Sequence, residues 1–196
     1  MTIEEGLKHF QADALRYALA SNFPEQADTE ISYEEIARRV NEELVANWGN
    51  LVNRVLSMTY KTCGGAVAEP GELTKDDTTL LAFIDRSLEE SAELFEIVEL
   101  RAALRKGMEA AQAANRYLNA TEPWKLAKTD PDRARTILYV ALSAINGIRV
   151  MLSPFLPFTS EKLNDILGHP EDWSRVPLNA GLPIPRPTPL FNKIEA

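Results

Sequence analysis

The segment that most constrains the fold is "DRARTILYVALSAINGIRVML", residues 132–152, which follows Asp130 and Pro131. An aspartate before a proline at the first helical position is a typical helix start. After Thr136 the segment is apolar on nearly every face, which indicates a helix surrounded by other helices. Its apolar run falls short of the roughly 20 residues that a membrane helix needs. We therefore interpret it as the buried centre of a helical bundle.

Other segments show one-sided helical patterns. Ser32 and Glu35 form a capping-box pattern that predicts a long helix from Tyr33 to about Thr62. Further helices are expected over residues 75–95, near 98–118 and within 153–167, and two short ones before residue 22. The apolar stripe of the long helix is spaced by threes and fours and consists of Ala37, Val40, Leu44, Trp48, Leu51, Val55 and Met58.

The chain contains neither strand-like alternation nor an Asn-Gly or Asp-Gly hairpin turn. We predict an all-α antiparallel bundle of about five main helices over residues 31–176, preceded by a separate segment over 1–30. Residues 177–196 carry five prolines and are interpreted as an extended Pro-rich C-terminal strap, held by Leu190 and Phe191. A disordered tail is the alternative.

Composition excludes several classes of function. The formal net charge of −8 argues against indiscriminate nucleic-acid binding, although it leaves room for a local site. A single cysteine, Cys63, precludes an internal disulfide and fits a reducing, cytoplasmic location. The two histidines lie far apart and outside any Cys/His cluster, so we expect no metal site. Nucleotide-binding loops and hydrolase motifs are absent, and we predict no catalytic residues.

Two polar residues of the long helix are candidates for ligand contact. Asn50 and Arg54 are four residues apart and share a helix face at the flank of the apolar stripe. An amide and a planar guanidinium together supply the donors and acceptors that a base edge requires. The alternative is that Arg54 pairs with an acidic side chain of a neighbouring helix and that Asn50 has no role.

The stretch "ANRYLNATEPWKLAK", residues 114–128, places a tryptophan directly after a helix-breaking proline. Trp124 either fills a core or waits as a platform for a flat partner. Asn115 lies within the apolar stripe of its helix and must be hydrogen-bonded. We expect it to organise the loop that bears Trp124.

Several segments occur here in the order seen in methionyl-tRNA synthetases. They are "DALRYALA", "RVNEELVANWGNLVNRVL", "ANRYLNATEPWKLAK", "LSPFLPFTSEKL" and "PLFNKIE". From about residue 3 to 195 the chain resembles the anticodon-binding helical bundle that follows the catalytic domain of this class I ligase of protein biosynthesis. The resemblance implies that residues 1–30 are a remnant of the connector (stem-contact) helices and that residues 31–176 are the anticodon-binding bundle.

The resemblance also implies a site and partners. Asn50, Arg54, Pro123 and Trp124 match family residues that contact the CAU anticodon of tRNA(Met), with the tryptophan stacking on a base. Nearby basic residues would contact phosphates; they are Lys125, Lys128, Arg133 and Arg135. The catalytic domain of the parent synthetase is the second expected partner.

The HIGH and KMSKS motifs of a complete synthetase are absent from this sequence. Methionine and ATP would therefore bind a catalytic domain outside this chain. We expect the chain alone to be inactive and to hold no cofactor.

Two alternatives stay open. The chain could be a free-standing helical paralogue that acts as an RNA-binding or protein-binding adaptor, with an acidic face from Glu89 to Glu99 as its docking surface. It could also be the anticodon domain of a related class I synthetase for valine, isoleucine, leucine or cysteine.

Overall fold

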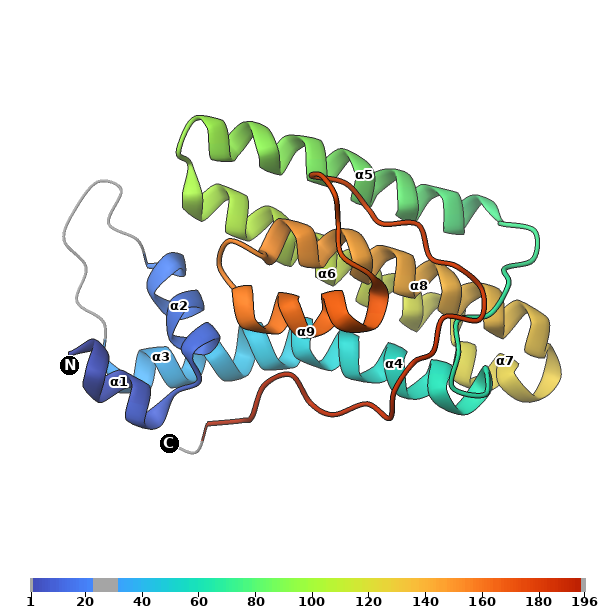
Figure 1. Cartoon of the computed structure of the whole chain (residues 1–196), viewed down its shortest axis with the longest axis horizontal. Helices are drawn as coiled ribbons and strands as arrows, with labels where there is room; N and C mark the ends of the chain where they lie inside the picture. The colour runs from blue at the N-terminus through green and yellow to red at the C-terminus, as the bar shows by residue number, and fades with distance from the viewer. Residues whose placement is uncertain (1, 23–31, 195–196) are drawn as a thin grey trace.

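The centre of the fold is helix α8, Pro131–Leu152, in a computed structural model that describes residues 2–22 and 32–194. Asp130 caps its start by accepting a hydrogen bond from the Arg133 amide at 3.1 Å, and every residue from 140 to 152 is buried. Figure 1 shows α8 among the other long helices. The helices that pack against it are α4 (Asn50–Thr62), α5 (Lys75–Glu96), α6 (Leu100–Thr121), α7 (Pro123–Thr129) and α9 (Pro157–Leu167). The predicted all-α bundle around an apolar helix is confirmed.

By length and composition α8 is long and apolar enough to cross a membrane, so the expectation that its apolar stretch is too short for a membrane helix is wrong. However, 89% of its most apolar window is buried inside the fold, as in the core helix of a bundle. The helix also buries Arg149, whose side chain donates to Asn146 Oδ1 at 2.7 Å and to the Gly168 carbonyl. Burial lowers the pKa of Arg149 to about 10, and the negative charge of Glu161 offsets only part of this effect.

The long helix predicted from Tyr33 to Thr62 exists, but its middle is wider than an α-helix. It runs as α3 (Tyr33–Arg39), a π-helical segment η1 (Val40–Gly49) and α4. Three apolar residues, Val40, Leu44 and Trp48, follow one another at intervals of four and are all buried. Repeated spacings of four exceed the α-helical period, and the wider π turn brings all three to the core. The stripe predicted the face but not this change in turn.

The two short helices at the N-terminus, α1 (Ile3–His9) and α2 (Ala12–Ser21), are confirmed. α2 is attached to the start of α9. Asp13 accepts hydrogen bonds from the amide and hydroxyl of Thr159, both at 2.7 Å, and Arg16 donates to the carbonyl of Pro154 at 2.8 Å. These contacts fix α2 on the bundle.

A buried network joins the ends of three helices. Asp77, in the first turn of α5, is fully buried and accepts from both terminal nitrogens of Arg133 at 2.6 and 2.8 Å. It also accepts from the Tyr117 hydroxyl at 2.5 Å and the Thr74 amide at 2.8 Å. Burial alone would raise the pKa of Asp77, but these hydrogen bonds outweigh it and lower the pKa to about 2. The network ties the end of α6 to the start of α8, and α7 lies between those two helices in the chain.

The extended C-terminal strap is confirmed for the residues that the structure describes. The chain leaves α9 at Leu167 and crosses the bundle in Figure 1 without forming another helix up to residue 194. Leu190 and Phe191 are buried, as predicted. Ile194 exchanges two hydrogen bonds of 2.8 Å with the Asn41 side chain of η1. Backbone pairing outside the described helices includes an isolated antiparallel bridge between Ala66 and Pro183.

Candidate nucleic-acid interface

An open groove of about 410 Å³ lies between α6 and the helix formed by η1 and α4. Both walls are polar, and most of the side chains that line it are exposed. The η1 and α4 wall consists of Glu42, Ala46, Asn47, Asn50 and Arg54, and the α6 wall of Gln112, Asn115, Arg116 and Asn119. Asn50 and Arg54 therefore lie on one side of a groove, as their spacing predicted.

Arg54 reaches from this groove to Trp124. Its guanidinium carbon lies 5.4 Å from the centroid of the tryptophan ring, within the range of a cation–π contact. One terminal nitrogen donates to Asn119 Oδ1 at 3.2 Å. Neither contact involves an acidic side chain, which removes the alternative that Arg54 merely pairs with an acid. The Asn50 side chain makes no hydrogen bond with any described residue, so its donors and acceptor are free.

Trp124 is 41% exposed, and the interpretation as a core plug is wrong. The residue that is buried at this corner is Pro123. The break that the sequence predicted occurs one residue earlier, at Glu122, which has φ +44° in the left-handed region. Pro123 then starts α7, a short helix that the sequence did not predict, and Trp124 lies in its first turn. Such a turn, with its proline buried, holds the indole at the surface.

The prediction for Asn115 is wrong. Its side-chain nitrogen donates to Asn47 Oδ1 at 2.9 Å, to the Asn47 carbonyl at 3.2 Å and to the Ala111 carbonyl at 3.2 Å. Asn47 in turn donates to the Met108 carbonyl at 3.1 Å. The two asparagines thus join α6 to η1 across the floor of the groove. Asn115 points to the facing helix, not to the turn before Trp124.

The four predicted phosphate-contacting residues differ in what they do. The prediction that Arg133 contacts phosphate is wrong, because Asp77 holds its guanidinium in the buried network. Arg135 is exposed and pairs with exposed Asp132 at 2.9 Å. Lys125 pairs with Glu122 at 2.7 Å. Lys128 is exposed and forms no ion pair within the described ranges. Lys125 and Lys128 share the short helix of Trp124 and remain candidates, as does Arg135.

Sequence reasoning missed the α6 wall. Gln112, Arg116 and Asn119 are exposed and line the groove at intervals of four and three, a helical face of its own. The signal was present, but the apolar stripe of the same helix was followed instead. Arg116 forms no ion pair with a described residue.

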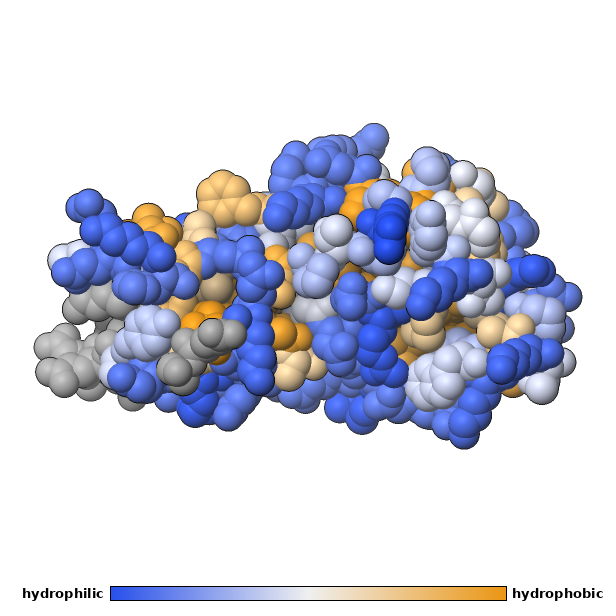
Figure 2. Space-filling view, turned by 90° about the horizontal axis from the view of Figure 1, so that it is seen from below, coloured by the Kyte–Doolittle hydropathy of each residue, from blue (hydrophilic) through white to orange (hydrophobic). Residues whose placement is uncertain are grey.

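Figure 2 shows the face seen from below Figure 1, where hydrophilic side chains cover most of the surface and hydrophobic atoms lie in small separate areas. One group of metal-ligand type is present among the described residues. Glu161 and Asp165 on α9 and His169 just beyond its end are all exposed, and their ligand atoms lie within 4.8 Å of each other. Exposed acidic side chains on one helix face commonly occur without a metal.

A helical bundle with an exposed tryptophan beside a polar groove agrees with the expected class of protein, the anticodon-binding region of class I tRNA synthetases, and the comparisons with known proteins show that class. Residues 1–56 match the family model of class I tRNA synthetases of the methionine type. Residues 67–196 match the model described as the anticodon binding domain of methionyl tRNA ligase. Because this second match covers well over half of the chain, the chain belongs to the family of methionyl-tRNA ligase anticodon-binding domains.

Individual relatives agree with this assignment. The chain is 42% identical to a methionine–tRNA ligase of Roseiflexus castenholzii over 95% of its own length and 36% of the relative's. For the ligase of Thermobifida fusca the identity is 34%, over 98% and 38%. The apo crystal structure of Mycobacterium tuberculosis methionyl-tRNA synthetase superposes with a TM-score of 0.90 at 31% identity, over 98% of this chain and 41% of that one. The chain thus spans less than half the length of these relatives.

Proposed function

We propose that this chain recognises the CAU anticodon of tRNA(Met) as the anticodon-binding domain of a methionine–tRNA ligase. The observation that carries the proposal is the Arg54 guanidinium 5.4 Å from the exposed ring of Trp124, beside the unpaired amide of Asn50. Specific RNA recognition favours unpaired bases that stack on aromatic rings or guanidinium planes and are read at their edges. This corner of the groove offers both kinds of contact within a few residues.

Each side chain has a distinct role in this proposal. Trp124 provides a stacking surface worth about 1–3 kcal/mol per base. Arg54 and Asn50 donate to and accept from base edges, and Pro123 holds the indole at the surface through the turn at Glu122. In the proposal, Lys125, Lys128 and Arg135 contact phosphates near the stacked base.

The chemistry of the parent enzyme lies outside this chain in the proposal. The parent ligase would join methionine to tRNA(Met) with ATP in a catalytic domain, and the present chain would hold the anticodon so that the other end of the tRNA reaches that domain. Residues 1–30 would connect the two parts. A cytoplasmic location is part of the same proposal.

The proposal is tested with Arg54→Lys. Lysine retains the charge but loses the planar fork that reads a base edge and packs on an indole. We expect the preference for a CAU anticodon stem-loop over loops with one changed base to fall roughly tenfold, as one lost edge contact would predict. The salt dependence of binding should stay the same, because the charge is kept. An unchanged preference would contradict the role of Arg54. Lys162→Arg on α9, outside both hollows, is the matched control.

A further inference from the structure

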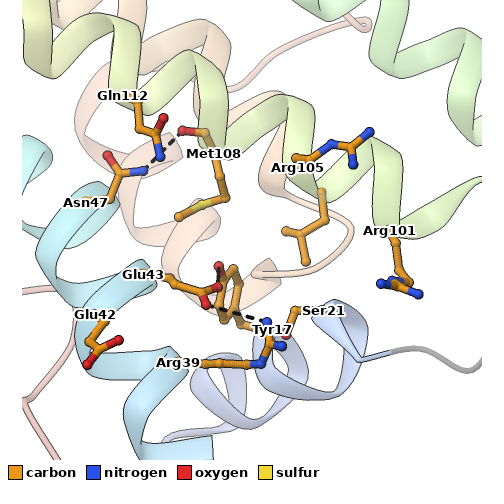
Figure 3. Close-up of a pocket in the computed structure, with 11 residues that line it drawn as sticks. Tyr17, Ser21, Arg39, Glu42, Glu43, Asn47, Arg101, Arg105, Met108 and Gln112 are labelled. Carbon is orange, nitrogen blue, oxygen red and sulfur yellow. Dashed lines mark hydrogen bonds and ion pairs between the residues drawn. The ribbon is translucent and has the colours of Figure 1, made fainter. Parts of the chain in front are cut away.

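A second hollow of about 360 Å³ continues the groove away from Trp124, between α2, η1 and α6. It shares Glu42, Asn47 and Gln112 with the groove, so the two hollows form one continuous surface. Figure 3 shows Arg101 and Arg105 projecting from α6 at one side, with Tyr17 and Ser21 of α2 below. None of the sequence predictions referred to this end.

The floor of the second hollow is already neutralised. The Tyr17 hydroxyl donates to Glu43 Oε2 at 2.8 Å, and Arg39 pairs with Glu35 at 2.7 Å and with Glu43 at 3.5 Å. Burial and the hydrogen bond to Glu43 raise the pKa of Tyr17, which therefore stays protonated. Tyr17 is the aromatic side chain among the described residues that line this hollow, and it is buried, so no base could stack on it.

Exposed arginines follow one another along the α6 wall. Arg101, Arg105 and Arg116 are all exposed and lie on the groove side of the helix. At 1.5 Å of rise per residue, Arg105 and Arg116 are roughly 16 Å apart along the axis. Arg105 is 75% exposed, and its contact with Glu109 is a weak one at 3.7 Å. Arg39 is paired with Glu35 and Glu43, whereas Arg105 and Arg116 keep exposed positive charge in a chain whose net charge is −8.

We propose that Arg105 and Arg116 bind the phosphate backbone of the nucleotides that flank the anticodon, along the α6 wall. The inference rests on the proposed function, because it takes the occupant of the groove to be the RNA whose bases reach Trp124. A row of exposed cations on one helix wall, with no exposed ring among the described residues that line its far end, suits a backbone and not bases. The row orients the stem so that the loop meets Trp124, and it carries no sequence preference itself.

The test compares Arg105→Ala and Arg116→Ala with the unchanged chain in binding a CAU anticodon stem-loop across a salt series. Each variant should weaken binding roughly threefold to fivefold at 0.15 M salt and reduce the salt slope by about one. The ratio of affinities for CAU and for a one-base variant should not change. Lys162→Ala, an exposed cation on α9 outside both hollows, should leave the slope unchanged. All three residues are exposed, so circular dichroism should show native helix content.

Replacing individual phosphates of the RNA with uncharged linkages identifies which phosphate each arginine contacts. Methylphosphonate linkages in the flanking nucleotides should weaken binding to the unchanged chain, and Arg105→Ala should abolish that effect at the linkage it contacts. Equal salt slopes for the unchanged chain and both variants, or a methylphosphonate effect that persists in them, would overturn the inference. Either outcome would be expected if these arginines bound an acidic protein instead of RNA. If the slopes change as stated but CAU is not preferred, the proposed function fails while the backbone site stands.

Discussion

Replacing Arg133 with methionine tests the buried network that holds the two helices flanking α7. The Asp77 carboxylate is fully buried and would lose two charged hydrogen bonds of 2.6 and 2.8 Å while keeping those from Tyr117 and Thr74. Removing one partner of a buried ion pair costs about 3–5 kcal/mol, because a buried charge is left without compensation. For a domain of this size that corresponds to a fall in Tm of roughly 6–20 °C.

The assay is urea unfolding followed by circular dichroism, with Arg135→Met as the matched control. Arg135 is two residues away, and its pair with Asp132 is exposed, so its loss should cost under about 1 kcal/mol. Free energies of unfolding that agree within 1 kcal/mol for the two variants would refute the network. If Arg133 instead contacted phosphate, its loss would reduce the salt slope of RNA binding in the folded protein. We expect no such reduction.

The same pair sets a pH dependence. Asp77 has a folded pKa of about 2, below the value of about 3.9 for an unfolded aspartate. Its contribution is therefore complete above pH 4 and is lost as the pH falls toward 2. In Arg133→Met the remaining burial raises the pKa of Asp77, so its proton is taken up at higher pH. The difference in stability between the two proteins should shrink as the pH falls below 4. A constant difference would contradict the assigned pKa.

Three further substitutions test packing around the site. Trp124→Ala should change the free energy of unfolding by under about 1 kcal/mol, since the indole is 41% exposed; unfolding of this variant at room temperature would restore the core-plug interpretation. Gly147→Ala in α8 should destabilise by about 1–3 kcal/mol, because the new methyl would lie 2.5 Å from Ile84 Cγ2, and denaturant melts measure the loss. Phe191→Ala should cost about 3–5 kcal/mol if the strap is part of the core, whereas a melt like that of the unchanged chain would show that the strap is not.

The sequence predicted those helices that follow from local patterns along one segment of the chain. The apolar helix after Pro131, the helix expected over residues 75–95 and the long helix from Tyr33 all follow local rules, and all are found. The π turn in η1 was missed because spacings of four also fit an α-helix. Helix α7 was not predicted, because a proline usually ends a helix. Here Glu122 adopts a left-handed conformation, and a new helix starts at the next residue, Pro123.

The site was predicted only in part, because side-chain partners depend on which helices face each other. The face of Asn50 and Arg54 follows from helical periodicity, but the contact with Trp124 depends on packing between distant segments. Arg133 looked like a free cation in the sequence, and only the fold brings Asp77 to it. Asn115 was correctly expected to need a partner, yet its partner is Asn47 across the groove.

The measurement that tests the central claim most directly is the affinity of this chain for two anticodon stem-loops, one with CAU and one with a single changed anticodon base. Fluorescence anisotropy at fixed salt gives both dissociation constants. The account predicts a preference of roughly tenfold for CAU, in line with about 1–3 kcal/mol per base-edge contact. It also predicts weaker binding to both RNAs in Trp124→Ala, because stacking contributes whichever base is present. Equal affinity of the unchanged, folded chain for both RNAs would contradict the claim that the groove beside Trp124 reads the anticodon.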